Sequence, residues 1–136
     1  MGLDNGIVLK AKTSRGIEYL AENHSFYFYD SGDEIGYWRK CWNIRNKVLN
    51  AFNDKGYDGD GGYINLTSVE DLVNMAETLK YFLHEENWDE DESIWEWYIE
   101  LPPIADAIKK LRCLIEDIEN EDISIDDLNI YFYDSY

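Results

Sequence analysis

The chain contains few of the residues that mark disulfide-rich, membrane or secreted proteins. Its 136 residues include two cysteines, two prolines and two histidines. Two cysteines form no disulfide framework, and because Cys41 and Cys113 fall on apolar helical patterns, we expect both thiols to be buried. No stretch approaches the ~20 apolar residues that span a bilayer, and the N-terminus does not resemble a signal peptide. We therefore expect a soluble cytoplasmic protein.

Histidine is too scarce to support a simple catalytic hypothesis. Nucleophilic catalysis needs a base beside the nucleophile, and that base is usually histidine. His24 falls in an expected turn and His84 at an expected helix end, so solvated side chains are the simpler interpretation of both. The chain also lacks a phosphate-binding loop, a dinucleotide fingerprint and a Gly-x-Ser-x-Gly motif. The sequence indicates no catalytic residue and no cofactor.

Basic residues are scarce as well, and they are unevenly distributed. There are 12 Lys and Arg against 29 Asp and Glu, which gives a formal net charge of −17. Most bases of the middle of the chain gather in residues 36–55, whereas Lys80 is the single base among the acids of residues 56–100. Because a surface of this sign repels polyanions, we expect no direct nucleic-acid partner and no membrane partner.

Apolar and aromatic residues are abundant enough for one folded domain spanning residues 1–136. They make up 45% and 15% of the chain, which argues against disorder. Patterns typical of strands occur over 6–12, 16–21, 25–29, 62–66, 94–101 (alternatively a helical turn) and 128–133. Apolar side chains at helical spacing occur over 37–52, from 67 to 83, and from Pro102 to 118. This predicts an α+β fold with an antiparallel sheet of about five strands and three helices, mainly packed on one face.

The tetrapeptide Tyr37-Trp38-Arg39-Lys40 opens the first expected helix. In the structural interpretation Trp38 is buried, while Arg39 and Lys40 are solvated or pair with nearby acids. In the functional interpretation, aromatic and guanidinium groups together form a stacking and anion-binding site. Asn43 lies four residues after Arg39, on the same helix face. The resulting candidates for a small anionic or nucleotide-like ligand are Tyr37, Trp38, Arg39, Lys40, Asn43 and Arg45.

An acidic run over residues 85–92 surrounds one tryptophan. As a solvated loop it needs no function. As a binding surface, Trp88 would be an exposed anchor, since tryptophan is enriched in binding hot spots. Asp89 and Asp91 would then belong to an acidic surface that imitates a phosphate backbone. Trp88, Asp89 and Asp91 are therefore candidate partner-binding residues.

The segment Asp58-Gly59-Asp60 resembles part of a calcium-binding loop. An EF-hand needs a bidentate glutamate at its twelfth position, and the two possible registers place Thr67 or Asn65 there. A flexible turn is the simpler interpretation. Asp58 and Asp60 remain weak candidates for a cation site.

Three segments together resemble a known protein family. They are Met1-Gly2-Leu3-Asp4, Gly36-Tyr37-Trp38-Arg39-Lys40 with Ile44, and the aromatic end over residues 130–136. These segments are similar to those of a family of small proteins encoded by bacteriophages and prophages. The chain departs from that family at Trp42 and Arg45, where relatives often carry Asn and His. The resemblance implies a phage or prophage setting inside a bacterial cell and no established activity.

Three functions are compatible with these observations. The first is a non-enzymatic acidic protein-binding module, a phage accessory protein that binds a host protein and inhibits a host factor or defence, in one version as a nucleic-acid mimic. The second is a binder of a small anionic or nucleotide ligand through Trp38 and Arg39. The third is a metal-dependent hydrolase that uses clustered carboxylates.

Overall fold

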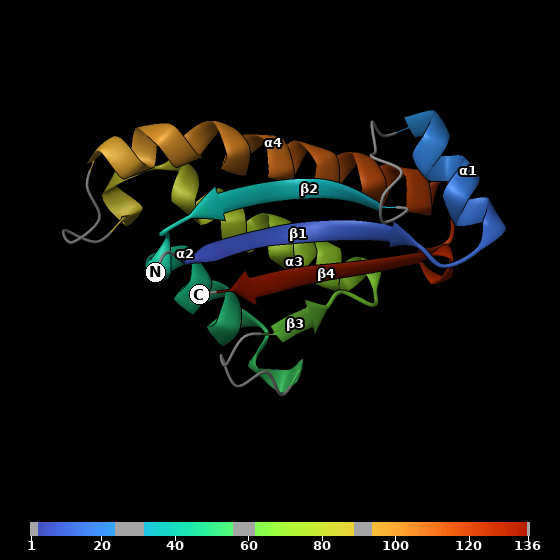
Figure 1. Cartoon of the computed structure of the whole chain (residues 1–136), viewed down its shortest axis with the longest axis horizontal. Helices are drawn as coiled ribbons and strands as arrows, with labels where there is room; N and C mark the ends of the chain where they lie inside the picture. Colours follow the sequence, from blue (N-terminus) through green and yellow to red (C-terminus); the bar gives the residue numbers. More distant parts are fainter. Residues whose placement is uncertain (1–2, 24–31, 56–61, 89–93, 136) are drawn as a thin grey trace.

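The computed structural model describes residues 3–23, 32–55, 62–88 and 94–135. These residues form a four-stranded antiparallel sheet in the order β2-β1-β4-β3, together with four α-helices (Figure 1). The strands are β1 (Asp4–Ala11), β2 (Gly32–Arg39), β3 (Gly62–Asn65) and β4 (Leu128–Ser135). The helices are α1 (Ser14–Asn23), α2 (Trp42–Ala51), α3 (Val69–Lys80) and α4 (Ile94–Glu119). The prediction of an α+β fold with an antiparallel sheet is confirmed.

The two central strands, β1 and β4, pair along their whole length. Asn5 lies opposite Trp38 of β2 and Asp134 of β4. The register between β1 and β2 shifts after Ile7, which leaves Ile35 as an extra residue in β2, a β-bulge. Asp4 pairs with Ser135, so both ends of the chain lie at the same end of the sheet, beside α2 (Figure 1).

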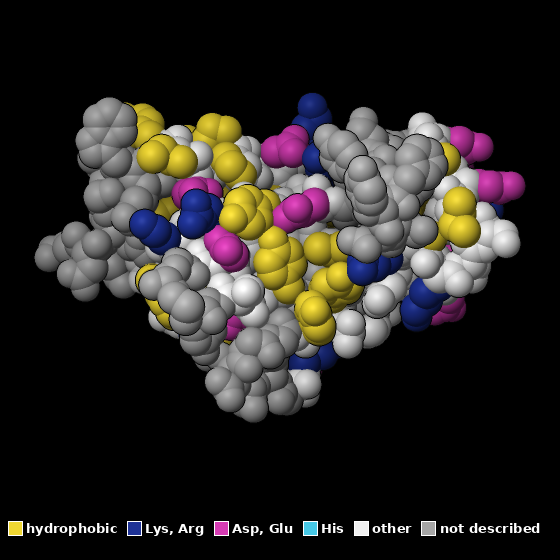
Figure 2. Space-filling view, viewed as in Figure 1, with side chains coloured by type: hydrophobic (Ala, Val, Ile, Leu, Met, Phe, Trp, Pro, Cys, Tyr) yellow, Lys and Arg dark blue, Asp and Glu magenta, His cyan; other side chains and the backbone are white. Residues whose placement is uncertain are grey.

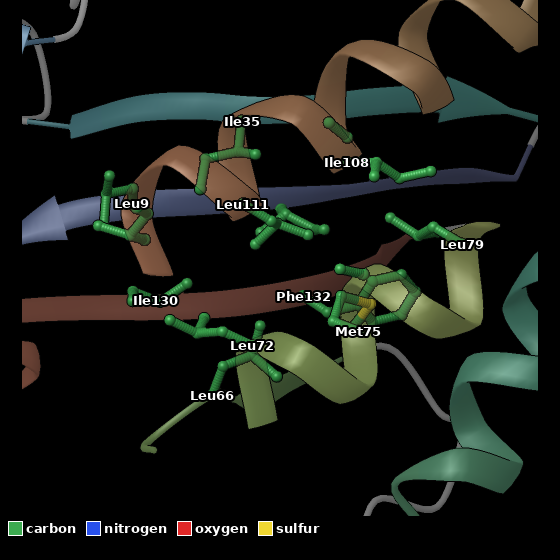
Figure 3. Packing of buried hydrophobic residues seen from close by; sticks show 14 of the residues in the cluster. Leu9, Ile35, Leu66, Leu72, Met75, Leu79, Ile108, Leu111, Ile130 and Phe132 are labelled. Carbon is green, nitrogen blue, oxygen red and sulfur yellow. The ribbon is translucent and has the colours of Figure 1, made fainter. Parts of the chain in front are cut away.

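One face of the sheet forms the hydrophobic core with α3 and α4. Figure 1 shows α3 passing behind the sheet and α4 running along β2, and Figure 3 shows their side chains meeting those of the strands. Because side chains alternate along a strand, β4 contributes Leu128, Ile130 and Phe132 to this face. The buried residues that meet them include Leu72, Met75 and Leu79 of α3 and Ile104, Ile108, Leu111 and Leu114 of α4.

Two segments that were predicted to be strands are helical. Residues 16–21 belong to α1, whose first turn is held by the N–H of Gly16 donating to Thr13 Oγ1 (3.1 Å). Tyr19 and Leu20 of α1 are buried, and the Tyr19 hydroxyl donates to Asp117 Oδ2 of α4 (2.6 Å). The hydrogen bond at the start of α1 and the packing of Tyr19 and Leu20 therefore outweigh the strand-like alternation of residues 16–21.

The segment 94–101 is the start of α4, which continues through Pro102 and Pro103. Each proline removes one backbone hydrogen bond, yet the helix continues because Ile104 and Ala107, in the next turn, are buried against the core. The helix that was expected to begin at Pro102 is therefore α4, and it begins at Ile94. The described sheet has four strands, not about five: the strands expected over 6–12, 62–66 and 128–133 are present, and β2 is added to them. The segment 25–29 lies outside the described residues.

The expected helix over 37–52 is divided between β2 and α2. Tyr37, Trp38 and Arg39 complete β2 because their backbone pairs with β1, where Arg39 lies opposite Asp4. Lys40 then turns the chain with φ 59° and donates its N–H to Leu3 O (2.8 Å), and α2 begins after Cys41.

The expected helix that starts near Thr67 is present as α3. Its N-cap is Ser68, whose hydroxyl accepts from the N–H of Asp71 (3.1 Å). Cys41 is buried as expected, but Cys113 is exposed, because its side of α4 faces away from the core. None of the described helices is long and apolar enough to cross a membrane.

Candidate functional site on the open face of the sheet

The face of the sheet that points away from α3 and α4 is rich in tyrosine. Because side chains alternate along a strand, the residues between the buried ones point to this face. No described helix crosses in front of it (Figure 1). Figure 2 shows hydrophobic side chains gathered over the middle of the sheet, with acidic and basic side chains among them. We call this surface the tyrosine face; it comprises Asp4, Val8, Lys10, Glu34, Tyr37, Arg39, Tyr63, Tyr131 and Tyr133.

Two of these tyrosines are strongly exposed, whereas their strand neighbours are buried. Tyr63 is 65% exposed and Tyr37 is 41% exposed. Ile64 and Trp38, the next residues along the same strands, are 1% exposed on the opposite face. The tyrosine face is thus an aromatic surface built directly on a packed core.

The rings of Tyr63 and Tyr131 contact each other edge to face. Their centroids lie 4.8 Å apart with an interplanar angle of 76°. Lys10 Nζ lies 5.9 Å from the centroid of Tyr131, within the range of a cation–π interaction. These contacts hold Tyr63 and Tyr131 in a fixed arrangement.

Tyr133 lies over β1 because Gly6 leaves room for its ring. A Cβ at Gly6 would be 2.6 Å from Tyr133 Cε1 and 2.5 Å from the carbonyl oxygen of Gly36. The ring therefore crosses β1 from β4, and its hydroxyl donates to Glu34 Oε1 of β2 (2.9 Å). One tyrosine links three strands on the open face.

The hydroxyl groups of Tyr37 and Tyr133 are both fixed by carboxylates. Tyr37 donates to Asp4 Oδ1 (2.9 Å), which also accepts from Arg39 Nε (3.2 Å). Burial first, and then the hydrogen bond to Glu34, raises the pKa of Tyr133 well above its ordinary value. The pKa of Tyr37 is raised in the same direction by burial and by its hydrogen bond to Asp4. Both phenols therefore remain neutral donors over the physiological pH range.

A buried ion pair lies on the opposite face of the same end of the sheet. Asp134, whose side chain has no exposed surface, accepts from Arg45 Nε of α2 (2.8 Å) and from Asn5 Nδ2 (2.9 Å). The Arg45 guanidinium also lies 5.4 Å from the ring centroid of Trp42. This arrangement attaches α2 to the two central strands, so we interpret it as structural.

The ligand site predicted around Trp38 and Arg39 is not assembled as expected. Consecutive residues of a strand point to opposite faces, so Trp38 is buried in the core while Arg39 lies on the tyrosine face. Arg39 and Asn43 do not share a helix face, because only Asn43 belongs to α2. Arg45 is directed to Asp134. Of the six residues, only Tyr37 and Arg39 come together, through their shared contact with Asp4; Lys40 is exposed in the turn that follows.

Trp88 is not the exposed anchor that the acidic run predicted. Its indole N–H donates to the carbonyl oxygen of Phe82 (3.0 Å), and the two rings are in edge-to-face contact at 5.9 Å. Trp88 is half-buried against the core because the chain folds back after α3. The other acidic candidates, Asp89, Asp91, Asp58 and Asp60, lie outside the described residues.

Sequence reasoning missed most of the tyrosine face, although a signal was present. The aromatic end was predicted as a strand, and in it Tyr131 and Tyr133 alternate with Ile130 and Phe132. That alternation predicts two tyrosines on one face and two apolar residues on the other. What the alternation could not show is that Tyr63 lies beside them on β3.

Comparison with known proteins adds no further residue to this site. The chain matched no protein-family model, no curated protein and no solved structure. The functional interpretation therefore depends on the geometry of the tyrosine face.

Proposed function

We propose that this chain is a non-enzymatic protein-binding module whose binding surface is the tyrosine face. The observation that carries the proposal is a set of four tyrosines on a sheet face that no described helix covers. Tyrosine is enriched in protein interfaces because it provides a large, rigid contact area and loses little conformational freedom on binding. The hydroxyl contacts of Tyr37 and Tyr133 make this surface preorganised.

A polypeptide fits the tyrosine face better than a nucleic acid does. Proteins that stack single-stranded nucleic acid on aromatic rings combine those rings with a positively charged groove. Here the bases Lys10 and Arg39 are matched by the acids Asp4 and Glu34, and the Arg39 charge is paired with Asp4. The net charge of −17 opposes a polyanion further.

The resemblance to phage and prophage proteins supplies the setting of the proposal. In that setting the module is an accessory protein that binds a host protein in the bacterial cytoplasm and inhibits a host factor or defence. The balanced charges of the tyrosine face favour direct binding through aromatic contacts over imitation of a phosphate backbone. A mimic would instead use the acids of residues 56–100.

The two other hypotheses gain no support from the described residues. The ligand hypothesis required Trp38 to stack beside Arg39, and these side chains lie on opposite faces of β2. The hydrolase hypothesis required clustered carboxylates, and the described part of the chain contains no group of three or more His, Cys, Asp or Glu that could hold a metal ion. Protein binding is therefore the function that the geometry supports best.

Site-specific photo-crosslinking tests this proposal. A photoreactive phenylalanine replaces Tyr63 on the tyrosine face or, as the control, Val73, which is 42% exposed on α3. We expect the Tyr63 position alone to crosslink a discrete protein in a bacterial lysate. With that partner purified, Tyr131→Ala should weaken binding about 30-fold, the effect of losing one hot-spot residue. Equal crosslinking from Val73, or unchanged affinity of Tyr131→Ala, would contradict the proposal.

A further inference from the structure

We infer that the partner presents an arginine- or lysine-bearing segment to the tyrosine face, with one cationic side chain placed against Glu34. The inference depends on the proposed protein-binding function and specifies the chemistry of its partner. The two carboxylates of this face, Asp4 and Glu34, have different surroundings. Asp4 accepts from Arg39 Nε at 3.2 Å, so its charge is already paired. Glu34 is exposed and contacts no lysine or arginine in the part of the chain that the structure describes.

The hydrogen bond to Glu34 leaves its charge uncompensated. Tyr133 donates to Oε1 only, at 2.9 Å, and a neutral hydroxyl orients a carboxylate without neutralising it. The raised pKa of Tyr133, caused by burial and by this bond, means that the donor does not ionise. Glu34 is therefore an oriented acceptor with its second oxygen available to an incoming ammonium or guanidinium group.

Two tyrosines share the tyrosine face with this acceptor. The ring of Tyr133 crosses β1 and its hydroxyl contacts Glu34 directly. Tyr37 belongs to the same strand as Glu34, and its hydroxyl donates to Asp4 on the same face. A guanidinium group stacks on aromatic faces and pairs with a carboxylate at the same time. The face makes both contacts with its own cations, since Lys10 lies over Tyr131 and Arg39 pairs with Asp4.

Long-range electrostatic attraction also favours a cationic partner. The chain carries a net charge of −17, so a cationic segment is attracted before contact and an acidic one is repelled. A second copy of this chain carries the same charge and is disfavoured by it. The occupant that fits Glu34, the neighbouring rings and the overall field is a basic segment of another protein.

Fluorescence anisotropy with labelled peptides tests this inference on the full chain. The probes are a nine-residue glycine-rich peptide with four arginines and the same peptide with four lysines or four glutamates. We expect the arginine peptide to bind and Glu34→Gln to weaken it at least fivefold. Glu70→Gln, which removes an equal charge from the exposed first turn of α3, should change affinity less than twofold.

Three outcomes would overturn the inference. Tyr133→Phe keeps the ring and the charge of Glu34 but removes the orienting hydrogen bond, so it should weaken binding of the arginine peptide less than Glu34→Gln does. A larger loss from Tyr133→Phe than from Glu34→Gln would overturn the inference. Equal weakening by Glu34→Gln and Glu70→Gln would also overturn it, because attraction would then depend on net charge alone. The inference would also be overturned if sedimentation velocity showed that the wild type is a dimer and that Glu34→Gln is a monomer. The occupant of the tyrosine face would then be a second copy of this chain.

The crosslinked partner separates the two proposals. A partner whose affinity falls with Tyr131→Ala but not with Glu34→Gln would overturn the cationic segment and leave the protein-binding function in place. Absence of any partner specific to the Tyr63 position would overturn both. A partner whose affinity falls with both variants supports both.

Discussion

At the scale of single residues, the ion pair between Asp134 and Arg45 is more deeply buried than the other ion pairs of the described residues. The side chain of Asp134 has no exposed surface and that of Arg45 is 11% exposed, so both charges are removed from water. Removing one partner of a buried pair leaves the other uncompensated. We expect Asp134→Ala to lower the free energy of unfolding by about 3–5 kcal/mol, measured by urea denaturation.

The double variant Arg45→Met with Asp134→Leu is the control for that prediction. Replacing both charges by apolar side chains of similar size removes the desolvation cost together with the attraction. We expect the double variant to be more stable than Asp134→Ala. If the two are equally unstable, the loss reflects packing and not the loss of the charge on Asp134.

At the scale of elements, the start of α3 is linked to the short 3-10 turn that follows α2 (Asn53–Lys55). Burial would raise the pKa of Asp71, but hydrogen bonds from Lys55 Nζ (2.8 Å) and from the N–H of Thr67 (2.9 Å) outweigh burial and lower it. Because the pKa is lower in the folded chain, ionised Asp71 stabilises the fold above its ordinary pKa of about 3.9. That contribution is lost as the pH falls through the folded pKa.

The corresponding prediction concerns Asp71→Asn across pH. At pH 7 this variant should be less stable than the wild type, and the difference should shrink as the pH falls below about 4. Thermal unfolding at pH 3, 4, 5 and 7 measures it. A difference that stays constant over this range would show that the charge of Asp71 is not the cause.

The contact between β2 and α4 requires two small residues. A Cβ at Gly36 would lie 2.7 Å from Ala107 Cβ and 3.1 Å from Trp38 Cζ3. We expect Gly36→Ala to cost about 1–3 kcal/mol of stability through overpacking, measured by urea denaturation. Adding Ala107→Gly restores space, so the double variant should lose less than the sum of the single losses. Additive losses would show that the two positions are not in contact.

At the scale of the whole molecule, the net charge of −17 opposes the compact state. Salt screens this repulsion, because the Debye length falls from ~30 Å at 0.01 M to ~10 Å at 0.1 M ionic strength. We expect the midpoint of thermal unfolding to rise by roughly 3–5 °C between 0.01 M and 0.2 M sodium chloride, equivalent to about 1 kcal/mol. Choline chloride should act equally. A midpoint that falls with salt would mean that the ion pairs outweigh the repulsion.

Several elements could be predicted from the sequence because their signals are local. The apolar stripe of α3 and the residues around Ser68 specify a helix and its start within a short segment. The alternation over Leu128–Ser135 specifies a strand with one apolar face. Burial of Trp38 was one of two interpretations of its tetrapeptide, the other being a ligand-binding role. Tyr37 and Arg39 were candidates for binding before their strand was known.

The remaining part of the site could not be predicted, because it depends on pairing between distant segments. Tyr37, Trp38 and Arg39 fit a helical pattern until β1 pairs with their backbone, and that pairing sends Trp38 and Arg39 to opposite faces. Tyr63 and Tyr131 lie 68 positions apart, yet β3 and β4 place their ring centroids 4.8 Å from each other.

The sequence by itself determined the acidic character, the α+β class and the alternation of buried and outward side chains along β4. Composition and periodicity carry that information without reference to distant residues. Only the tertiary structure decided which ambiguous segments became helices and which became strands. The reason is that buried backbone groups need hydrogen-bond partners, and for a strand those partners lie in other segments of the chain. The tyrosine face exists because four strands, from both ends and the middle of the chain, provide backbone hydrogen-bond partners for one another.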